Sequence, residues 1–228
     1  MTLRRTRLLV PLLAVSLAGV AAFAPPAAAQ SKSDKAILKA GVITKADVPP
    51  DWASKKSTST DRAYKGIPEC KELKSAVDNA KKKVPRAQSR EYSEPTSRST
   101  TSAESTVYAF KKVSDAQEFT AVYQAPDASA CLEKAAAKVA SGQATAGEPS
   151  VSPISNLDGV GDEAVGYEIT VPYSAGNQSA TLYVDLIAVR VGRAFIGFNF
   201  SNLGETISGG PSIVQSVVAR VAEAQASA

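Results

Sequence analysis

The 228-residue chain contains no histidine. Imidazole is the usual general base of nucleophilic active sites, so Ser-His-Asp triads and Cys-His pairs are excluded. Zinc sites with a histidine ligand are excluded for the same reason. A lysine-activated serine remains chemically conceivable, but no SxxK motif stands at a predicted helix start together with its companion motifs. The sequence therefore predicts a protein that is not an enzyme.

Long hydrophobic runs are also missing from most of the chain. After Gln30 the longest apolar stretches are interrupted by Asp185, Arg190 and Arg193. A membrane-spanning helix needs about 20 consecutive apolar residues. No membrane anchor is expected in residues 30–228.

The one long apolar run, Leu8 to Ala24, follows three arginines and precedes Ala27-Ala28-Ala29. Basic residues, an apolar segment and small residues in this order are typical of a secretory signal peptide. We expect residues 1–29 to be removed after Ala29. The alternative, a membrane anchor, is disfavoured because the run contains Pro11 and is shorter than a span requires.

The residues around the predicted cleavage site indicate the export route and the final state. Leu3 and Arg7 depart from the residues usual around a twin-arginine signal, so Arg4-Arg5 does not indicate that route and general secretion is expected. A lipoprotein would carry cysteine directly after cleavage, where this chain has Gln30. The sequence predicts a secreted, extracellular protein, with residues 30–228 forming one domain.

Cysteine is scarce, with only Cys70 and Cys131. Two thiols cannot form an all-cysteine zinc site, and neither residue belongs to a CxxC motif. A reactive thiol is the alternative, but no histidine is present to activate it. In an exported chain we therefore expect a structural Cys70–Cys131 disulfide.

Net charge is small but unevenly distributed along the chain. Removal of the signal arginines would leave 23 basic and 22 acidic side chains. Residues 30–113 hold 18 basic and 10 acidic residues, whereas residues 114–228 hold 5 and 12. Either the fold interleaves the two halves, which we favour, or a basic face binds anionic polymers of the cell envelope. No nucleic-acid-binding motif is present, so nucleic acid is not an expected partner.

Motifs for phosphate or metal binding are incomplete. Gly159-Val160-Gly161 lacks the third glycine and the following helix of a dinucleotide loop, and no P-loop occurs. Asp158, Asp162 and Glu163 form the only acidic cluster suited to calcium binding or glycoside hydrolysis. The liganding positions of an EF-hand are not filled, so a structural turn is expected, with no metal and no cofactor.

Hydrophobic periodicity predicts an α+β fold with an antiparallel sheet of about five strands. Helices are expected at 35–40, ending at Gly41 in a left-handed position, at 67–84, from a Ser114/Gln117 capping box, and from Asp127 to Gly142. A last helix is expected after Pro211, with a frayed C-terminal AQASA and with one apolar face formed by Ile213, Val214, Val217, Val218 and Val221. Strands are expected at 86–94, 103–111, 166–172, 179–191 and 193–202, the last three forming a meander. Trp52 is expected to fill the edge of the core.

Several segments together resemble one known family. They are AGVITKADVPPDW, VYAFKKVSDAQEFTAVYQ, LDGVGDEA and RVGRAFIGF, with a cysteine in each of two helices and a C-terminal helix. The chain resembles actinobacterial secreted proteins of the PknH-like extracellular sensor-domain type over about residues 40–224. The resemblance implies an extracytoplasmic ligand-binding or sensing module whose sheet and helices enclose a cleft.

The chain departs from that family in ways that affect function. It has one possible disulfide where the kinase-borne domain is expected to have two, and it has no kinase domain or lipid-attachment motif. A sensor without a transducer cannot signal across a membrane by itself. We therefore expect a non-catalytic module that binds a small or polymeric envelope ligand, through residues that the sequence does not identify.

The alternative is a wall-associated structural protein that holds anionic polymer. Its basic N-terminal half would supply the contacts, through Lys55, Lys56, Lys65, Lys71, Lys74, Lys81, Lys82 and Lys83. Such binding would be lost at modest ionic strength.

Overall fold

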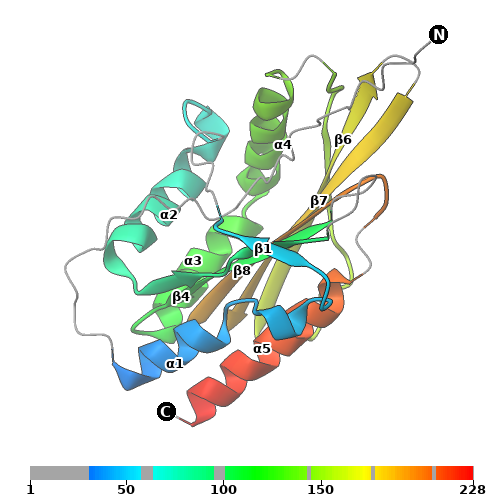
Figure 1. Cartoon of the computed structure of the whole chain (residues 1–228). Helices are drawn as coiled ribbons and strands as arrows, with labels where there is room; N and C mark the ends of the chain where they lie inside the picture. Colours follow the sequence, from blue (N-terminus) through cyan, green and yellow to red (C-terminus); the bar gives the residue numbers. More distant parts are fainter. Residues whose placement is uncertain are drawn as a thin grey trace.

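An antiparallel sheet lies between two groups of helices (Figure 1). The computed structural model describes residues 31–57, 64–94, 101–142, 145–175, 178–206 and 209–227. The predicted signal peptide, residues 1–29, lies outside the described residues. The structure confirms the predicted α+β class.

The sheet has eight strands in the described ranges, with the order β1-β3-β4-β8-β7-β6-β5, and β2 pairs separately with β4. The strands are β1 Ala53–Lys55, β2 Arg86–Gln88, β3 Glu91–Ser93, β4 Ser102–Ala109, β5 Ser150–Pro153, β6 Glu163–Ala175, β7 Gln178–Val191 and β8 Ala194–Leu203. The strands β6, β7 and β8 form the predicted meander, and β8 also pairs with β4 along its length.

The central strand β7 is apolar on both faces because helices cover both sides of the sheet. Leu182, Val184 and Leu186 belong to one core cluster. The intervening residues Ile187, Val189 and Val191 belong to the other cluster. Alternate residues of a strand point to opposite faces, so each face is packed on its own set of helices.

One face packs against α2 Lys71–Lys83, α3 Val113–Gln124 and α4 Pro126–Ala140. A 3-10 turn, η2 Pro68–Cys70, leads into α2. The disulfide between Cys70 and Cys131 joins this turn to α4, with both cysteines fully buried and their Cα atoms 4.7 Å apart. The predicted pairing is confirmed.

The other face packs against α1 Lys32–Ala40 and α5 Gly210–Ala226, which lie side by side in Figure 1. The 3-10 turn η1 Lys45–Asp47 follows α1. The apolar face predicted for the last helix is confirmed, since Ile213, Val214, Val217 and Val221 are buried. Trp52 packs at the edge of this core, as predicted.

Two arginines tie α1 and α5 to the rest of the molecule. Arg193, in the β7–β8 turn, donates to Asp34 Oδ1 at 2.6 Å and to the carbonyl of Phe110 at 2.6 Å. Arg220 of α5 donates to both carboxylate oxygens of Asp47, at 2.5 and 3.0 Å. Each pair joins an aspartate from the N-terminal half of the chain to an arginine from the C-terminal half, so the two halves interleave here.

Several local predictions need correction. The sheet has more strands than the five expected, because the predicted strand 86–94 is divided into β2 and β3. In addition, β1 and β5 are only three or four residues long and carry no visible alternation of apolar residues. Helix α1 begins three residues before the predicted start, since Ser31 accepts from the Asp34 backbone and Asp34 accepts from Ser31, completing a capping box. Helix α5 extends through Ala226 within the segment expected to fray.

Two capping predictions are wrong for a physical reason. The expected Ser114/Gln117 capping box does not form, because α3 begins at Val113 and its N-cap is Lys112. Gly41 has a φ of −83°, so it does not occupy the left-handed conformation. A Cβ at Gly41 would lie 2.6 Å from Cγ2 of Val107, so the glycine permits close packing of the chain against β4.

Among the described residues, no helix has the length and apolarity needed to cross a membrane.

Candidate functional site

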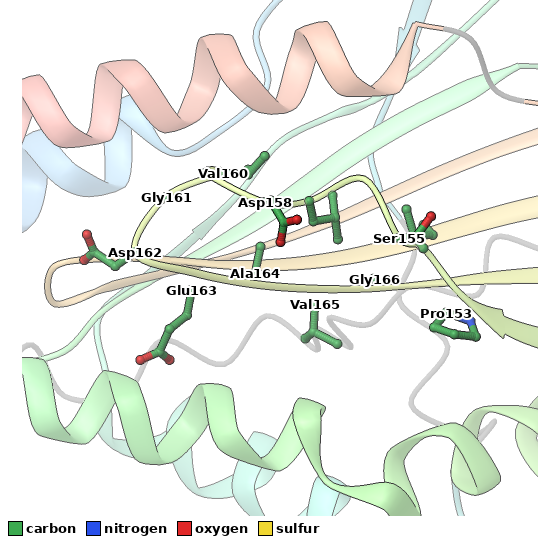
Figure 2. A pocket seen from close by; sticks show the side chains of 13 residues that line it. Pro153, Ser155, Asp158, Val160, Gly161, Asp162, Glu163, Ala164, Val165 and Gly166 are labelled. Atoms are coloured by element: carbon green, nitrogen blue, oxygen red, sulfur yellow. The ribbon is translucent and has the colours of Figure 1, made fainter.

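The acidic turn between β5 and β6 contains the only candidate carboxylates that the sequence singled out (Figure 2). Asp162 accepts from Arg190 Nη1 at 2.8 Å, and Glu163 accepts from Arg190 Nη2 at 3.1 Å. Asp162 also accepts from the backbone N–H of Gly192 at 2.6 Å. Asp158 is exposed and lies on the opposite side of β6 from Glu163 in Figure 2.

This arrangement fits a structural turn. The Arg190 side chain is only 7% exposed, so the two carboxylates compensate a buried charge. Gly161 has a φ of +67°, and a Cβ there would lie 2.6 Å from the Arg190 carbonyl oxygen. The turn encloses about 310 Å³ beside β6, but the three carboxylates do not converge on it. Within the described ranges, no group of three or more acidic or cysteine side chains could hold a metal ion.

A larger cleft opens between α2 and α3, at the end of β4. Its volume is about 720 Å³, within the range of about 300 to 1,000 Å³ that small-molecule sites occupy. The cleft is lined by residues from α2, the 84–85 connection, the end of β4 and α3: Ala76, Asn79, Ala80, Lys83, Val84, Pro85, Ala109, Phe110, Lys111, Asp115, Glu118, Phe119 and Val122.

The cleft exists because α2 presents small side chains to its neighbour. Ala76 and Ala80 lie one helical turn apart on the same face of α2, opposite Phe119 and Val122 of α3. A large side chain at either alanine would fill the space between the helices. The small residues therefore leave a groove in a position where two helices normally interdigitate.

The floor of the cleft belongs to a buried aromatic cluster. Phe110 and Phe119 are 7% and 6% exposed, with ring centroids 5.3 Å apart. Phe119 also packs edge to face on Phe195 at 4.7 Å. Edge-to-face and tilted contacts are favourable arrangements for aromatic rings. The floor is thus apolar and preformed.

The rim of the cleft is charged. Lys83 and Lys111 stand on the rim with Asp115 and Glu118, and all four are exposed. A cleft with an apolar floor and with both positive and negative charges on its rim suits a ligand that has an apolar part and a charged or polar end. None of these positions was identified from the sequence. The sequence carried no signal for them, because the two alanines and the two phenylalanines belong to separate segments of the chain.

Deeper under this face, polar side chains line β4 and β8. Asn199 Nδ2 donates to Glu104 Oε1 at 3.1 Å, and the hydroxyls of Ser102 and Ser201 share a hydrogen bond of 2.8 Å. Ser57 donates to the other oxygen of Glu104. These buried groups largely satisfy one another, which is how polar side chains are tolerated inside a protein.

The lysines proposed for polymer binding fall on separate elements. Lys55, on β1, forms an ion pair with Glu91 at 3.0 Å, and Lys74 pairs with Asp78 within α2. Lys71, Lys82 and Lys83 are exposed on α2. Only the α2 lysines therefore lie close together on one surface element.

The fold and cleft define the class: an α+β protein with an antiparallel sheet, helices on both faces and one disulfide. No family model matches the chain. No curated protein matches it either. Among solved structures, the extracellular domain of PknH from Mycobacterium tuberculosis matches with 12% identity over 74% of this chain and 72% of that one, with a TM-score of 0.34. This is a weak structural resemblance.

Proposed function

We propose that the protein is an exported, non-catalytic binding module of the cell envelope whose ligand occupies the α2–α3 cleft. The cleft is the observation that carries this proposal: its volume of about 720 Å³ suits a small molecule, and its floor is apolar. The ligand is an amphiphile, with its apolar part on Phe110 and Phe119 and its polar end at the charged rim.

Two further observations support export and binding without catalysis. The Cys70–Cys131 disulfide is the kind of crosslink that persists in oxidising compartments. The chain has no histidine, and Asp162 and Glu163 are both engaged by Arg190. The leader pattern of residues 1–29 agrees with secretion.

The cleft is tested by filling it. The purified protein is titrated with 8-anilinonaphthalene-1-sulfonate, an anionic amphiphile whose fluorescence rises in apolar sites. Ala76→Phe places a ring between α2 and α3 and should weaken binding at least 10-fold. Ala219→Phe, at an exposed position of α5 on the other side of the sheet, is the matched control and should leave binding unchanged. Equal affinity of Ala76→Phe and the parent protein would rule out the cleft as the binding site.

Wall association through anionic polymer is the second candidate, and the exposed lysines of α2 favour it. A column carrying long-chain polyphosphate should retain the protein at low ionic strength and release it at about 0.2 M salt, where screening is strong. Replacing Lys71, Lys82 and Lys83 with serine should abolish retention. Replacing Lys32, Lys35 and Lys39 of α1 with serine removes the same charge and should leave retention unchanged. Equal loss of retention in both triple variants would show that retention depends on net charge and not on the α2 lysines.

A further inference from the structure

A second polar surface lies on the other side of the sheet from the α2–α3 cleft. Glu168 of β6 is directly opposite Asp185 of β7, and Tyr183 of β7 is directly opposite Asn202 of β8. Directly paired residues of neighbouring strands point to the same face. We call Glu168, Asp185, Tyr183 and Asn202 the acidic platform.

The acidic platform lies on the α1–α5 side, at the edge of the core, since Phe200, directly opposite Asp185 on β8, is buried in that core. Ile187 and Val189, the next residues of β7 on this face, are buried in the core with Val217 and Val221 of α5. Asp185 is two residues further along the strand and is only half-buried. Figure 1 shows the β6–β7 hairpin continuing well past α5.

The two carboxylates have no compensating cation among the described residues. Neither Glu168 nor Asp185 has a side-chain hydrogen bond or ion pair within those ranges, in contrast to Asp162 and Glu163 on Arg190. Burial, and then the charge of Glu168, raise the pKa of Asp185 to about 6. Like charges directly opposite on neighbouring strands repel, so a cation placed between them would be favourable.

Asn202 supplies an independent observation. The residue is 7% exposed, yet its side-chain oxygen Oδ1 has no hydrogen-bond partner. A buried acceptor is normally paired, so an unpaired one on this face calls for a donor. Beside it, the half-buried ring of Tyr183 offers an aromatic surface.

We propose that the acidic platform binds a primary ammonium group of a small amine. An ammonium has three N–H donors and no acceptor, which matches two carboxylates and an unpaired amide oxygen. The ring of Tyr183 adds a cation–π contact. A planar guanidinium is a poorer match, because its fork pairs with a single carboxylate and not with three acceptors on different strands.

A hard metal ion is the main competing occupant. Calcium takes six to eight oxygen ligands, and magnesium requires near-octahedral geometry. The platform offers two carboxylates and one amide oxygen. No larger acidic or cysteine group suited to a metal occurs among the described residues.

The experiment is an NMR titration of the purified protein with cadaverine, a diamine, following the carboxyl ¹³C shifts of Asp185 and Glu168. We expect saturable shifts at both carboxyls and at the Tyr183 ring. The neutral analogue 1,5-pentanediol should give none. Saturation by the diol at equal affinity, or by calcium chloride at lower concentration than the amine, would overturn the assignment to an ammonium.

Variants separate a defined site from a general acidic surface. Asp185→Asn and Glu168→Gln should each weaken cadaverine binding at least 5-fold. Asp158→Asn, which removes an exposed carboxylate elsewhere, should leave it unchanged. Asn202→Leu removes the acceptor without altering charge and should also weaken binding at least 3-fold. If that variant does not fold, Tyr183→Leu tests the ring at a half-exposed position. Equal weakening of cadaverine binding by Asp158→Asn, or no effect of Asn202→Leu on that binding, would contradict a defined binding site.

The ammonium proposal does not depend on the α2–α3 cleft, because the two sites lie on opposite faces of the sheet. Ala76→Phe should leave cadaverine binding intact, and Asp185→Asn should leave binding of the fluorescent amphiphile intact. Failure of either proposal can therefore be recognised separately.

Discussion

The two faces of the sheet are held together by different means. On the α2–α3–α4 face, a disulfide and a cluster of aromatic rings fix the helices. On the α1–α5 face, apolar packing that includes Phe198 and Phe200 is joined by two arginine–carboxylate pairs. The pairs are Arg193 with Asp34 and Arg220 with Asp47. The turn that leads into α2, one wall of the cleft, is thus covalently joined to α4. The helices on the closed face are held by packing and ionic hydrogen bonds.

The difference follows from what each face must bury. A groove between α2 and α3 leaves those helices with less mutual packing than a closed interface provides. A crosslink compensates by lowering the entropy of the unfolded chain, without needing further contacts in the folded state. Helices α1 and α5 pack closely on each other and on the sheet, so ordinary side-chain contacts suffice there.

Removing the disulfide should give the largest effect. The cysteines are separated by 61 residues, so the loop-closure estimate for Cys70→Ala with Cys131→Ala is a loss of about 4 kcal/mol in the free energy of unfolding. Urea unfolding measures this loss. Hydrogen exchange should quicken more in α2 than in α5. An equal increase in both helices would mean that the crosslink does not act on one face in particular.

Removing Arg220 tests the other face, with an intermediate effect. The Asp47 side chain is 4% exposed, so Arg220→Met would leave a buried carboxylate without its cation. We expect a loss of about 3 kcal/mol at pH 7. Lys39→Met, at an exposed lysine of α1, should change stability by less than about 0.5 kcal/mol.

The effect of Arg220 should also depend on pH. Burial by itself raises the pKa of Asp47, but hydrogen bonds from Arg220 and Thr44 outweigh it, and the pKa lies below its ordinary value of 3.8. The ionised form is therefore favoured in the folded state, and its contribution is present above pH 3.8 and lost as the pH falls through the lower, folded-state pKa. Urea unfolding at several pH values should show the parent and Arg220→Met converging in acid. A constant difference would argue against the ion pair as the cause.

Asp185→Asn should produce the smallest change in the free energy of unfolding, and this change should be a gain in stability. The folded-state pKa of about 6 lies above the ordinary value of 3.8, so the protonated form is favoured on folding and ionisation costs stability as the pH rises. Since solvent reaches part of the carboxyl, we expect the variant to be about 1 kcal/mol more stable at pH 7. The gain should vanish below about pH 4. Destabilisation at pH 7 would show that Asp185 has a favourable partner in the folded protein.

The long elements could be read from the sequence, whereas the short ones could not. The three strands of the meander, the stripe of Ile213, Val214, Val217 and Val221, and the pairing of two cysteines each have a strong local or compositional signal. Strands β1 and β5 carry no such signal: β5 pairs with the longer β6, and β1 pairs with β3, which is equally short. Gly41 resembles a helix-ending glycine, but its role depends on Val107, which is distant in sequence.

The candidate sites show the same division. The sequence marked Asp162 and Glu163 as a turn, and the structure adds that Arg190 binds both of them. It identified no cleft residue, because Ala76 and Phe119 acquire a shared role only when α2 and α3 are placed together on one face. The acidic platform depends likewise on register, which sets Glu168 against Asp185 and Tyr183 against Asn202.

The order of apolar and polar residues by itself determined the fold class, the long helices and strands and the disulfide, since each depends on neighbours in sequence or on cysteine count. Tertiary structure alone decided which small helical residues border a groove and which carboxylates receive a cation. The physical reason is that cavity volume and charge compensation depend on distances between side chains from separate elements, and only strand register and helix packing set those distances.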